Sequence, residues 1–329
     1  MPEDLSAFSR RAAAGAAGAV GTPVRLLGRL EAAGVDAPVP DPTFRRPAWM
    51  RVRAEFGPEY RELKRLVRDL ELHTVCEEAG CPNISECWSA GTATLMLLGE
   101  RCTRACGFCL IDTRRPEPVD AAEPARVAAA VARMGLSHAV LTMVARDDLD
   151  DGGAAHVAAT IGAIRASSPG TRVEVLISDL RGDPAALDVV LAARPDVLNH
   201  NLETVARLQR AVRPSAGYAR SLALLARSAA AGLVTKSGIM VGLGETTDEV
   251  HGALADLHAV GVGIVTIGQY LRPSAAHLPV VRWWTPEEFD ALADHGHGLG
   301  IAHVESGPLV RSSYHAREGA AAVEGTVVR

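Results

Sequence analysis

The six cysteines of this chain fall into two triplets, and this pattern constrains fold and chemistry more than any other feature. The spacing is C-x4-C-x5-C for Cys76, Cys81 and Cys87, and C-x3-C-x2-C for Cys102, Cys106 and Cys109. No other cysteine occurs among the 329 residues. Three thiolates in a short segment can ligate three irons of a cubane iron–sulfur cluster, and the fourth iron then needs another ligand. The sequence therefore predicts two clusters, each with one iron open to further binding.

Other uses of cysteine fit less well. Structural zinc sites take four ligands, usually from C-x2-C or Cys/His pairs, and neither triplet supplies four. Disulfide frameworks belong to short secreted chains. Inert buried thiols would be scattered along the chain. Reduced thiols also fit a cytoplasmic protein.

Composition narrows the range of partners. The chain has 34 Lys and Arg against 39 Asp and Glu, a formal charge of −5, whereas nucleic-acid-binding domains are usually basic. No apolar run approaches the ~20 residues of a membrane span, so we expect no membrane partner. The segment Ser9-Arg10-Arg11 loosely resembles a twin-arginine export signal, but the Ala- and Gly-rich stretch after it is weakly hydrophobic and favours a disordered extension.

The pattern predicts four regions. Residues 1–45 are an Ala- and Gly-rich arm that we expect to be disordered. Residues 46–93 form an N-terminal extension with a helix at 58–72 and the first triplet, where Gly80 and Pro82 favour a loop. Residues 94–306 form the core, and residues 307–329 a C-terminal segment containing Arg-Ser-Ser-Tyr.

The core alternates short apolar runs with helical patterns. We expect parallel strands at 94–98, 139–144, 173–177, 197–200, 235–241, 264–270 and 302–305. We expect helices at 123–134, 154–166, 184–193, 204–212, 221–231, 247–260 and 286–299. Six or seven β/α units predict an α/β fold, a full or partial (β/α) TIM-type barrel. A doubly wound open sheet is the alternative.

Polar residues follow nearly every predicted strand, where barrels of this kind carry their active sites. The second triplet follows the first strand. The later strand ends carry Arg146-Asp147-Asp148, Asp179 and Arg181, His200-Asn201 and Glu203, Gly242 to Glu245, Gln269-Tyr270 and Arg272, and Ser312-Ser313. For Asp179 and Thr246, a role in a turn or a helix cap is the alternative to a role in an active site.

The segment from Cys102 to Cys109, CTRACGFC, resembles the signature of the radical S-adenosylmethionine (SAM) superfamily. The resemblance implies that these three cysteines hold a [4Fe–4S] cluster whose fourth iron is chelated by SAM. Reductive cleavage of SAM then yields a 5′-deoxyadenosyl radical.

The rest of the chain, from about residue 45 to 316, resembles lipoyl synthases. The segments that carry the resemblance are HTVCEEAGCPN at 73–83, ECW at 86–88, GTAT at 91–94, RDDL at 146–149, DGGA at 151–154, NHNLET at 199–204, TKS at 235–237, GLGET at 242–246, QYLRPS at 269–274 and GPLVRSSY at 307–314. Leu95, Met143, Ser178 and Gly107 depart from the commonest pattern, which leaves open a paralogue with another substrate.

That family inserts two sulfur atoms, at C6 and C8 of an octanoyl chain on a lysine of a lipoyl carrier domain. The resemblance implies that Cys76, Cys81, Cys87 and one serine hold a sacrificial auxiliary [4Fe–4S] cluster, with Ser313 preferred over Ser312. Implied partners are the 2-oxoacid dehydrogenase E2 subunits, the glycine cleavage H protein, a ferredoxin or flavodoxin, and an iron–sulfur carrier for cluster rebuilding.

For SAM itself we select four residues. Phe108 can supply apolar contact, and Arg146 can pair with a carboxylate. Asn201 and Glu203 have suitable hydrogen-bonding groups. Arg213, Lys236 and Arg272 are candidates for orienting polar groups, and Lys236, inside a strand, has a structural ion pair as its alternative. A different radical SAM sulfur-inserting enzyme and a non-catalytic iron–sulfur carrier remain as competing functions.

Overall fold

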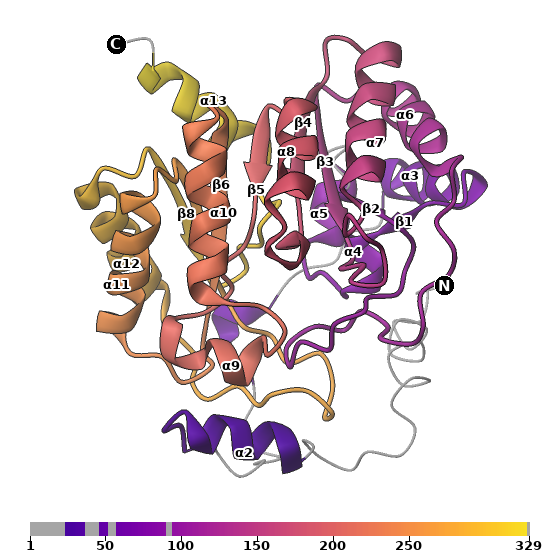
Figure 1. Ribbon diagram of the computed structural model, residues 1–329. Helices are drawn as coiled ribbons and strands as arrows, with labels where there is room; N and C mark the ends of the chain where they lie inside the picture. Colours follow the sequence, from indigo (N-terminus) through magenta and orange to yellow (C-terminus); the bar gives the residue numbers. More distant parts are fainter. Residues whose placement is uncertain (1–23, 37–45, 52–56, 90–93, 328–329) are drawn as a thin grey trace.

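Figure 1 shows a computed structural model of the chain, in which residues 24–36, 46–51, 57–89 and 94–327 are described. These residues form one eight-stranded sheet in the order β1 to β8. The strands are β1 (His73–Thr74), β2 (Thr94–Leu97), β3 (His138–Met143), β4 (Arg172–Leu176), β5 (Val197–Asn199), β6 (Val234–Val241), β7 (Ile264–Gln269) and β8 (His303–Gly307). β1 pairs antiparallel with β2, and every later pair is parallel. No pairing between β1 and β8 occurs in this part of the chain, so the sheet is a partial barrel.

Helices connect successive strands and cover the outside of the sheet (Figure 1). They are α6 (Glu123–Met134), α7 (Ala154–Ser167), α8 (Pro184–Ala192), α9 (Gln209–Val212), α10 (Tyr218–Ala230), α11 (Thr247–Ala259) and α12 (Pro286–Leu299), with the 3-10 turns η2 (Leu180–Gly182) and η3 (Ala206–Leu208). The β/α alternation predicted from the apolar runs is confirmed. The helix expected at 204–212 differs, because it consists of η3 followed by the single turn α9.

The helix ends follow local sequence rules. α11 begins with a capping box in which Thr246 accepts from the Glu249 amide and Glu249 accepts from the Thr246 amide, and Thr285 and Glu288 form the same arrangement at α12. The cap of α11 is therefore Thr246, which agrees with the capping role named as its alternative. Gly135 and Gly300 close α6 and α12 with positive φ angles.

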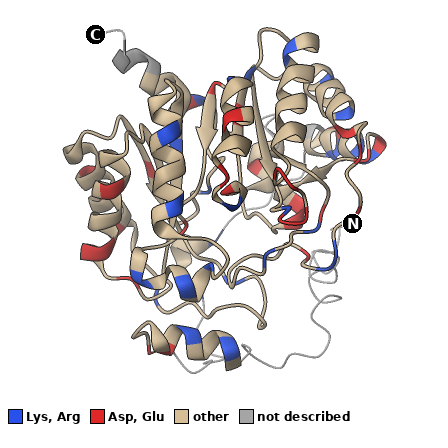
Figure 2. Cartoon of the chain, in the orientation of Figure 1, with Lys and Arg blue, Asp and Glu red and all other residues tan. Residues whose placement is uncertain are grey.

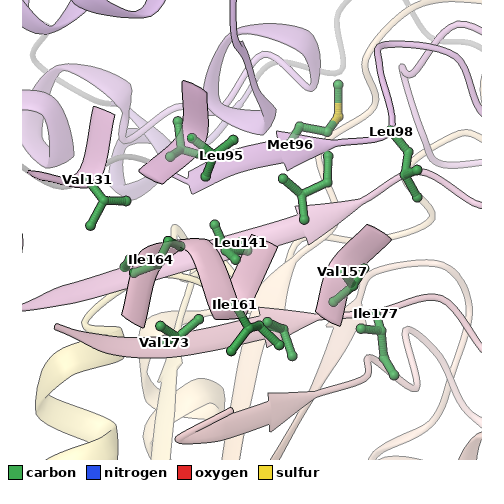
Figure 3. Packing of buried hydrophobic residues seen from close by; sticks show 14 of the residues in the cluster. Leu95, Met96, Leu98, Val131, Leu141, Val157, Ile161, Ile164, Val173 and Ile177 are labelled. Carbon is green, nitrogen blue, oxygen red and sulfur yellow. The ribbon is translucent and has the colours of Figure 1, made fainter. Parts of the chain in front are cut away.

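The core lies between the strands and their helices. Figure 3 shows Leu141 and Val173 of the sheet packed against Ile161 and Ile164 of α7, all of them fully buried. Aliphatic side chains dominate this layer, as the low aromatic content predicts. Burying side chains of this size contributes roughly 1.5–3 kcal/mol each before the entropy of ordering is counted.

A polar cluster is buried within the strands. Lys236 of β6 pairs with Glu174 of β4 at 2.9 Å. His138 lies 3.4 Å from the other Glu174 oxygen, and the Asn199 amide donates to Glu174 at 3.3 Å. Lys236 is therefore a member of a structural ion pair, as its alternative assignment proposed.

The N-terminal extension contains the helix expected at 58–72, which ends at Asp69, and two short helices where a loop was expected around the first triplet. Its helices are η1 (Ala48–Met50), α3 (Pro58–Asp69), α4 (Val75–Glu78) and α5 (Ile84–Ser89), and α13 (Ala316–Val327) follows the last strand. α4 begins where Thr74 accepts a hydrogen bond from the Glu77 amide, so a capping residue precedes the first cysteine. The loop expected from Gly80 and Pro82 is confined to the turn between α4 and α5.

The expectation of a disordered arm at 1–45 differs from the structure at 24–36. Val24–Ala32 forms α2, which packs against α9 below the barrel (Figure 1). Leu26 and Leu30 are buried, and Arg207 donates to the Ala33 carbonyl. Apolar residues at helical spacing inside an Ala-rich segment explain this order. The rest of the arm lies outside the described residues.

Candidate functional site

The first triplet lies around a cavity that the two extensions of the barrel form together. The cavity is partly open to solvent and is lined by Cys76, Cys81, Asn83, Cys87, Thr94, Arg311, Ser313 and Tyr314. α4, α5 and the turn between them supply the thiols, and the segment after β8 supplies the arginine, serine and tyrosine. Ser313 is among the lining residues and Ser312 is not.

Two hydrogen bonds hold these distant segments together. The Asn83 side chain donates to the Leu309 carbonyl at 2.8 Å, and the Tyr314 hydroxyl donates to Glu86 at 3.0 Å. Gly268 of β7 allows the close approach of the C-terminal segment, because a Cβ there would lie 2.1 Å from the Val310 oxygen. Sequence reasoning did not select Asn83 or Tyr314, although both lie within the family motifs.

The thiols of this triplet lie where burial disfavours the charged thiolate form. Burial raises the pKa of the Cys76 thiol to about 11 and that of Cys87 to about 12, with neighbouring thiols acting in the same direction. Thiolates here need positive charge close by, which iron supplies on binding. The Arg311 guanidinium also lies near Cys81, and burial lowers the pKa of that arginine. The donor set and the cavity therefore fit a cluster with one oxygen ligand.

The second triplet lies in a loop that starts after β2 at the C-terminal mouth of the barrel. The Cys102 amide donates to the backbone carbonyl of Asp112 at 2.8 Å, and the Gly107 amide donates to the backbone carbonyl of Val212 at 2.9 Å. His277 lies 2.9 Å from the Cys109 carbonyl. Gly107 packs so closely on Leu278 that a Cβ would approach it to 2.8 Å, which explains why a bulkier residue is absent.

Arg104 fastens this loop to two strand ends. Its guanidinium bonds both Asp147 oxygens at 2.7 Å and reaches Asp179 at 2.6 Å. Asp179 also accepts from Arg220 and from its own turn at Arg181. The strand-end residues Asp147 and Asp179 thus orient the loop through Arg104, which is a role beyond capping. Sequence reasoning did not select Arg104.

Asn201 and Glu203 lie together beside the second triplet. The Asn201 amide donates to Glu203 at 3.1 Å, while its buried oxygen has no hydrogen-bond partner. Burial raises the pKa of Glu203, although the nearby Arg213 and Asn201 act to lower it. Burial also raises the pKa of the Cys106 and Cys109 thiols, and the charge of Glu203 adds to that shift. Glu203 has a φ of 67°, and this left-handed turn carries the chain over Gly238. An unsatisfied oxygen beside a carboxylate fits a ligand that presents amine or hydroxyl donors.

Arg146 and Phe108 lie in different surroundings. The Arg146 guanidinium bonds both Asp148 oxygens at 2.8 Å and donates to the Leu98 carbonyl at 3.3 Å. Arg213, in contrast, is buried near Cys106 and donates to the Asn201 and Leu202 carbonyls. Phe108 packs on the apolar cluster formed by α2, α11 and α12. The Arg213 guanidinium therefore lies near the Cys106 thiol, whereas the Arg146 guanidinium is paired with Asp148.

The remaining strand-end residues have structural partners. His200 lies 2.9 Å from both the Ile177 carbonyl and the Ser221 hydroxyl. Glu245 accepts from the Leu243 amide and the Trp284 indole, and Gln269 accepts from the Trp284 amide. Arg272 donates to the His277 carbonyl at 3.1 Å. These groups order the loops around the mouth of the barrel.

Comparison with known proteins identifies the family. Residues 96–257 match the model of the radical SAM superfamily, and residues 40–81 match the N-terminal domain of lipoyl synthase. A lipoyl synthase from Rubrobacter xylanophilus is 57% identical over 83% of this chain and 86% of its own length, and one from Mycobacterium avium is 55% identical over 89% and 94%.

The chain belongs to the lipoyl synthase family. It is a radical SAM enzyme with two [4Fe–4S] clusters and SAM as cofactors, as the motifs predicted. Among solved structures, that of HydG, a maturase of the [FeFe]-hydrogenase, covers 97% of this chain and 70% of its own, with a TM-score of 0.52 and 15% identity. That likeness supports the fold alone. None of the described helices of this lipoyl synthase is long and apolar enough to cross a membrane.

Proposed function

We propose that this lipoyl synthase holds its auxiliary cluster with Cys76, Cys81, Cys87 and Ser313, and its SAM-binding cluster with Cys102, Cys106 and Cys109. The observation that carries the first assignment is the shared cavity, which gathers three buried thiols and Ser313. A serine oxygen is a harder ligand than a thiolate and suits iron less well. Such a ligand is easily displaced, as expected for a cluster that is dismantled in use.

The substrate is an octanoyl chain on a lysine of a lipoyl carrier domain, and sulfur enters at C6 and C8. Those carbons are unactivated, so acid–base catalysis cannot remove their hydrogens. When bound, the reduced SAM cluster supplies the electron that cleaves SAM into a hydrogen-abstracting 5′-deoxyadenosyl radical. The auxiliary cluster is the sulfur substrate.

The protein's own side chains position these groups. Arg104 holds the second cysteine loop against Asp147 and Asp179, which fixes the loop relative to β3 and β4. We assign Asn201 and Glu203 to the amine or hydroxyl groups of SAM, because an unsatisfied oxygen and a carboxylate lie there together. Phe108 and Arg146 remain candidates for SAM contact, and Arg213 is a further one for its carboxylate.

The finer partners follow from this chemistry. We propose E2 subunits and the glycine cleavage H protein as carriers, a ferredoxin or flavodoxin as electron donor, an iron–sulfur carrier for rebuilding, and a cytoplasmic location. Figure 2 shows both Lys or Arg and Asp or Glu residues on the helices, and the formal charge of −5 is unlike that of a basic nucleic-acid-binding domain. We also propose residues 46–93, 94–306 and 307–329 as functional regions, supported by β1, through which the extension adds a strand to the sheet.

An anaerobic assay tests the function. Reconstituted enzyme receives SAM, a strong reductant and a peptide carrying octanoyl-lysine, and mass spectrometry follows the peptide. The proposal predicts 5′-deoxyadenosine and a peptide that gains two sulfurs. Deoxyadenosine without sulfur insertion would point to another substrate. If enzyme that holds both clusters forms neither product, radical catalysis is contradicted.

A further inference from the structure

Three metal-binding side chains meet outside both cysteine triplets. They are His73 of β1, Glu78 of α4 and Glu100 in the segment after β2. One ligand atom from each lies within 4.8 Å of the other two, and all three residues are half-buried. No other three His, Cys, Asp or Glu side chains of the described ranges meet this way. Three separate elements therefore converge on one point.

The geometry differs from that of the cysteine triplets in an informative way. The three thiolates of a cubane bind three different irons, so their sulfur atoms stay apart. His73, Glu78 and Glu100 instead bring their ligand atoms close enough to bind a single ion.

The donor set selects a class of ion. Imidazole suits zinc, copper, iron and nickel, and carboxylate oxygens suit harder ions. One imidazole and two carboxylates form a nitrogen and oxygen donor set, unlike the soft thiolates of the triplets, and iron(II) is among the divalent ions that accept such donors. Manganese(II) accepts the same donors, and it serves as a spectroscopic probe.

The position of the group connects it to the clusters. Glu78 lies two residues after Cys76 and Glu100 two residues before Cys102, so the group joins the two cysteine-bearing segments of the chain. Under the proposed function, sulfur leaves the auxiliary cluster with the product. The irons that lose their bridging sulfides must then be released or held nearby.

We propose that His73, Glu78 and Glu100 bind a divalent first-row transition ion, and that in use this ion is iron(II) released from the spent auxiliary cluster. The site is a holding site, and the ion takes no part in hydrogen abstraction. The second half of this inference rests on the proposed function, whereas the ion binding does not.

Binding is tested with Mn²⁺ on the anaerobic enzyme loaded with both clusters. Loss of the free Mn²⁺ electron paramagnetic resonance signal should report one ion per chain. His73→Gln, Glu78→Gln and Glu100→Gln should each weaken binding at least tenfold. Glu77→Gln, a neighbouring carboxylate on α4 outside the group, is the matched control and should bind Mn²⁺ like the parent. Iron and sulfide analysis checks that every variant keeps both clusters.

Absence of Mn²⁺ binding, or binding that none of the three substitutions weakens, overturns the site. The second half is tested by single turnover in the presence of a colorimetric iron(II) chelator. Glu100→Gln should release iron to the chelator several-fold faster than the parent or Glu77→Gln, at equal sulfur insertion. Equal release rates would refute the holding role. If the parent inserts no sulfur at all, the proposed function fails while the Mn²⁺ result still decides the site.

Discussion

Arg104 and Asp147 form a bidentate ion pair with two nitrogen–oxygen distances of 2.7 Å, and this pair ties the second cysteine loop to the end of β3. A third bond from Arg104 to Asp179 extends the tie to the end of β4. Bidentate pairs of this kind fix direction as well as distance. The second cysteine loop is therefore held in a fixed direction against the ends of β3 and β4.

Arg104→Gln should slow SAM cleavage at least tenfold and lower the free energy of unfolding by roughly 3 kcal/mol, because it leaves Asp179 buried without a main partner. Deoxyadenosine formation and denaturant unfolding measure the two effects. Arg114→Gln removes an exposed pair with Asp112 and should change stability by about 1 kcal/mol or less. Unchanged SAM cleavage in Arg104→Gln would contradict the positioning role.

Cys106→Ala should abolish both SAM cleavage and sulfur insertion, whereas Cys81→Ala should retain SAM cleavage and lose sulfur insertion. The reason is that only the second triplet is expected to bind SAM. Deoxyadenosine and peptide sulfur are measured in the same reaction. Equal loss of both products in Cys81→Ala would refute this division between the triplets.

Ser313→Ala should lose sulfur insertion by tenfold or more, and Ser312→Ala should remain within about twofold of the parent. Ser313 lines the auxiliary cavity and its neighbour does not. Ser313→Cys should retain the cluster but transfer sulfur more slowly, because a thiolate binds iron more firmly than an alkoxide. The reverse ranking of the two alanine variants would assign the ligand to Ser312.

Lys236→Met should lower stability by about 3–5 kcal/mol, because it leaves Glu174 charged and buried. The double variant Glu174→Leu/Lys236→Met should recover much of this loss, since both charges are removed together. Although burial alone raises the pKa of Glu174, Lys236 and His138 hold it below its ordinary value. The pair's contribution should therefore be present at neutral pH and be lost only as pH falls through that lowered pKa.

His200 should make the stability of the fold depend on pH in a higher range than the Glu174–Lys236 pair does. Burial lowers the pKa of its imidazole to about 4 from an ordinary value of 6.5, and Arg213 acts in the same direction. The unfolded chain then binds more protons than the folded one between these values, so stability should fall as pH drops from 6.5 to 4. His200→Gln should flatten this part of the curve, measured by denaturant unfolding across pH. An unchanged slope would show that other groups dominate it.

Periodicity and spacing predicted most of the barrel because its strands are short apolar runs and its helices have strong ends. The Glu123–Met134 and Pro286–Leu299 helices match their predicted bounds. Around the first triplet, Gly80 and Pro82 favoured a loop, but the Thr74 cap and packing on Trp88 produced two short helices. α2 was missed because its Ala-rich surroundings obscured two buried leucines.

The candidate site shows the same limit. Clustering of the cysteines and the Arg-Ser-Ser-Tyr segment could be read directly from the chain. The preference for Ser313 agrees with the cavity lining, but the Asn83–Leu309 bond that closes the cavity joins residues far apart in the sequence. Likewise, the strand-end position of Arg146 suggested ligand binding, whereas the structure pairs its guanidinium with Asp148 two residues further on.

The auxiliary cavity has a consequence for how the enzyme matures. Asn83 and Leu309 are 226 positions apart, and the whole barrel lies between them. Under the proposed ligand set, the three thiols are near neighbours in the chain, whereas Ser313 reaches them only after the barrel has formed and carried the C-terminal segment back to Asn83. Completion of the auxiliary cluster should therefore require a folded barrel and an intact C-terminal segment.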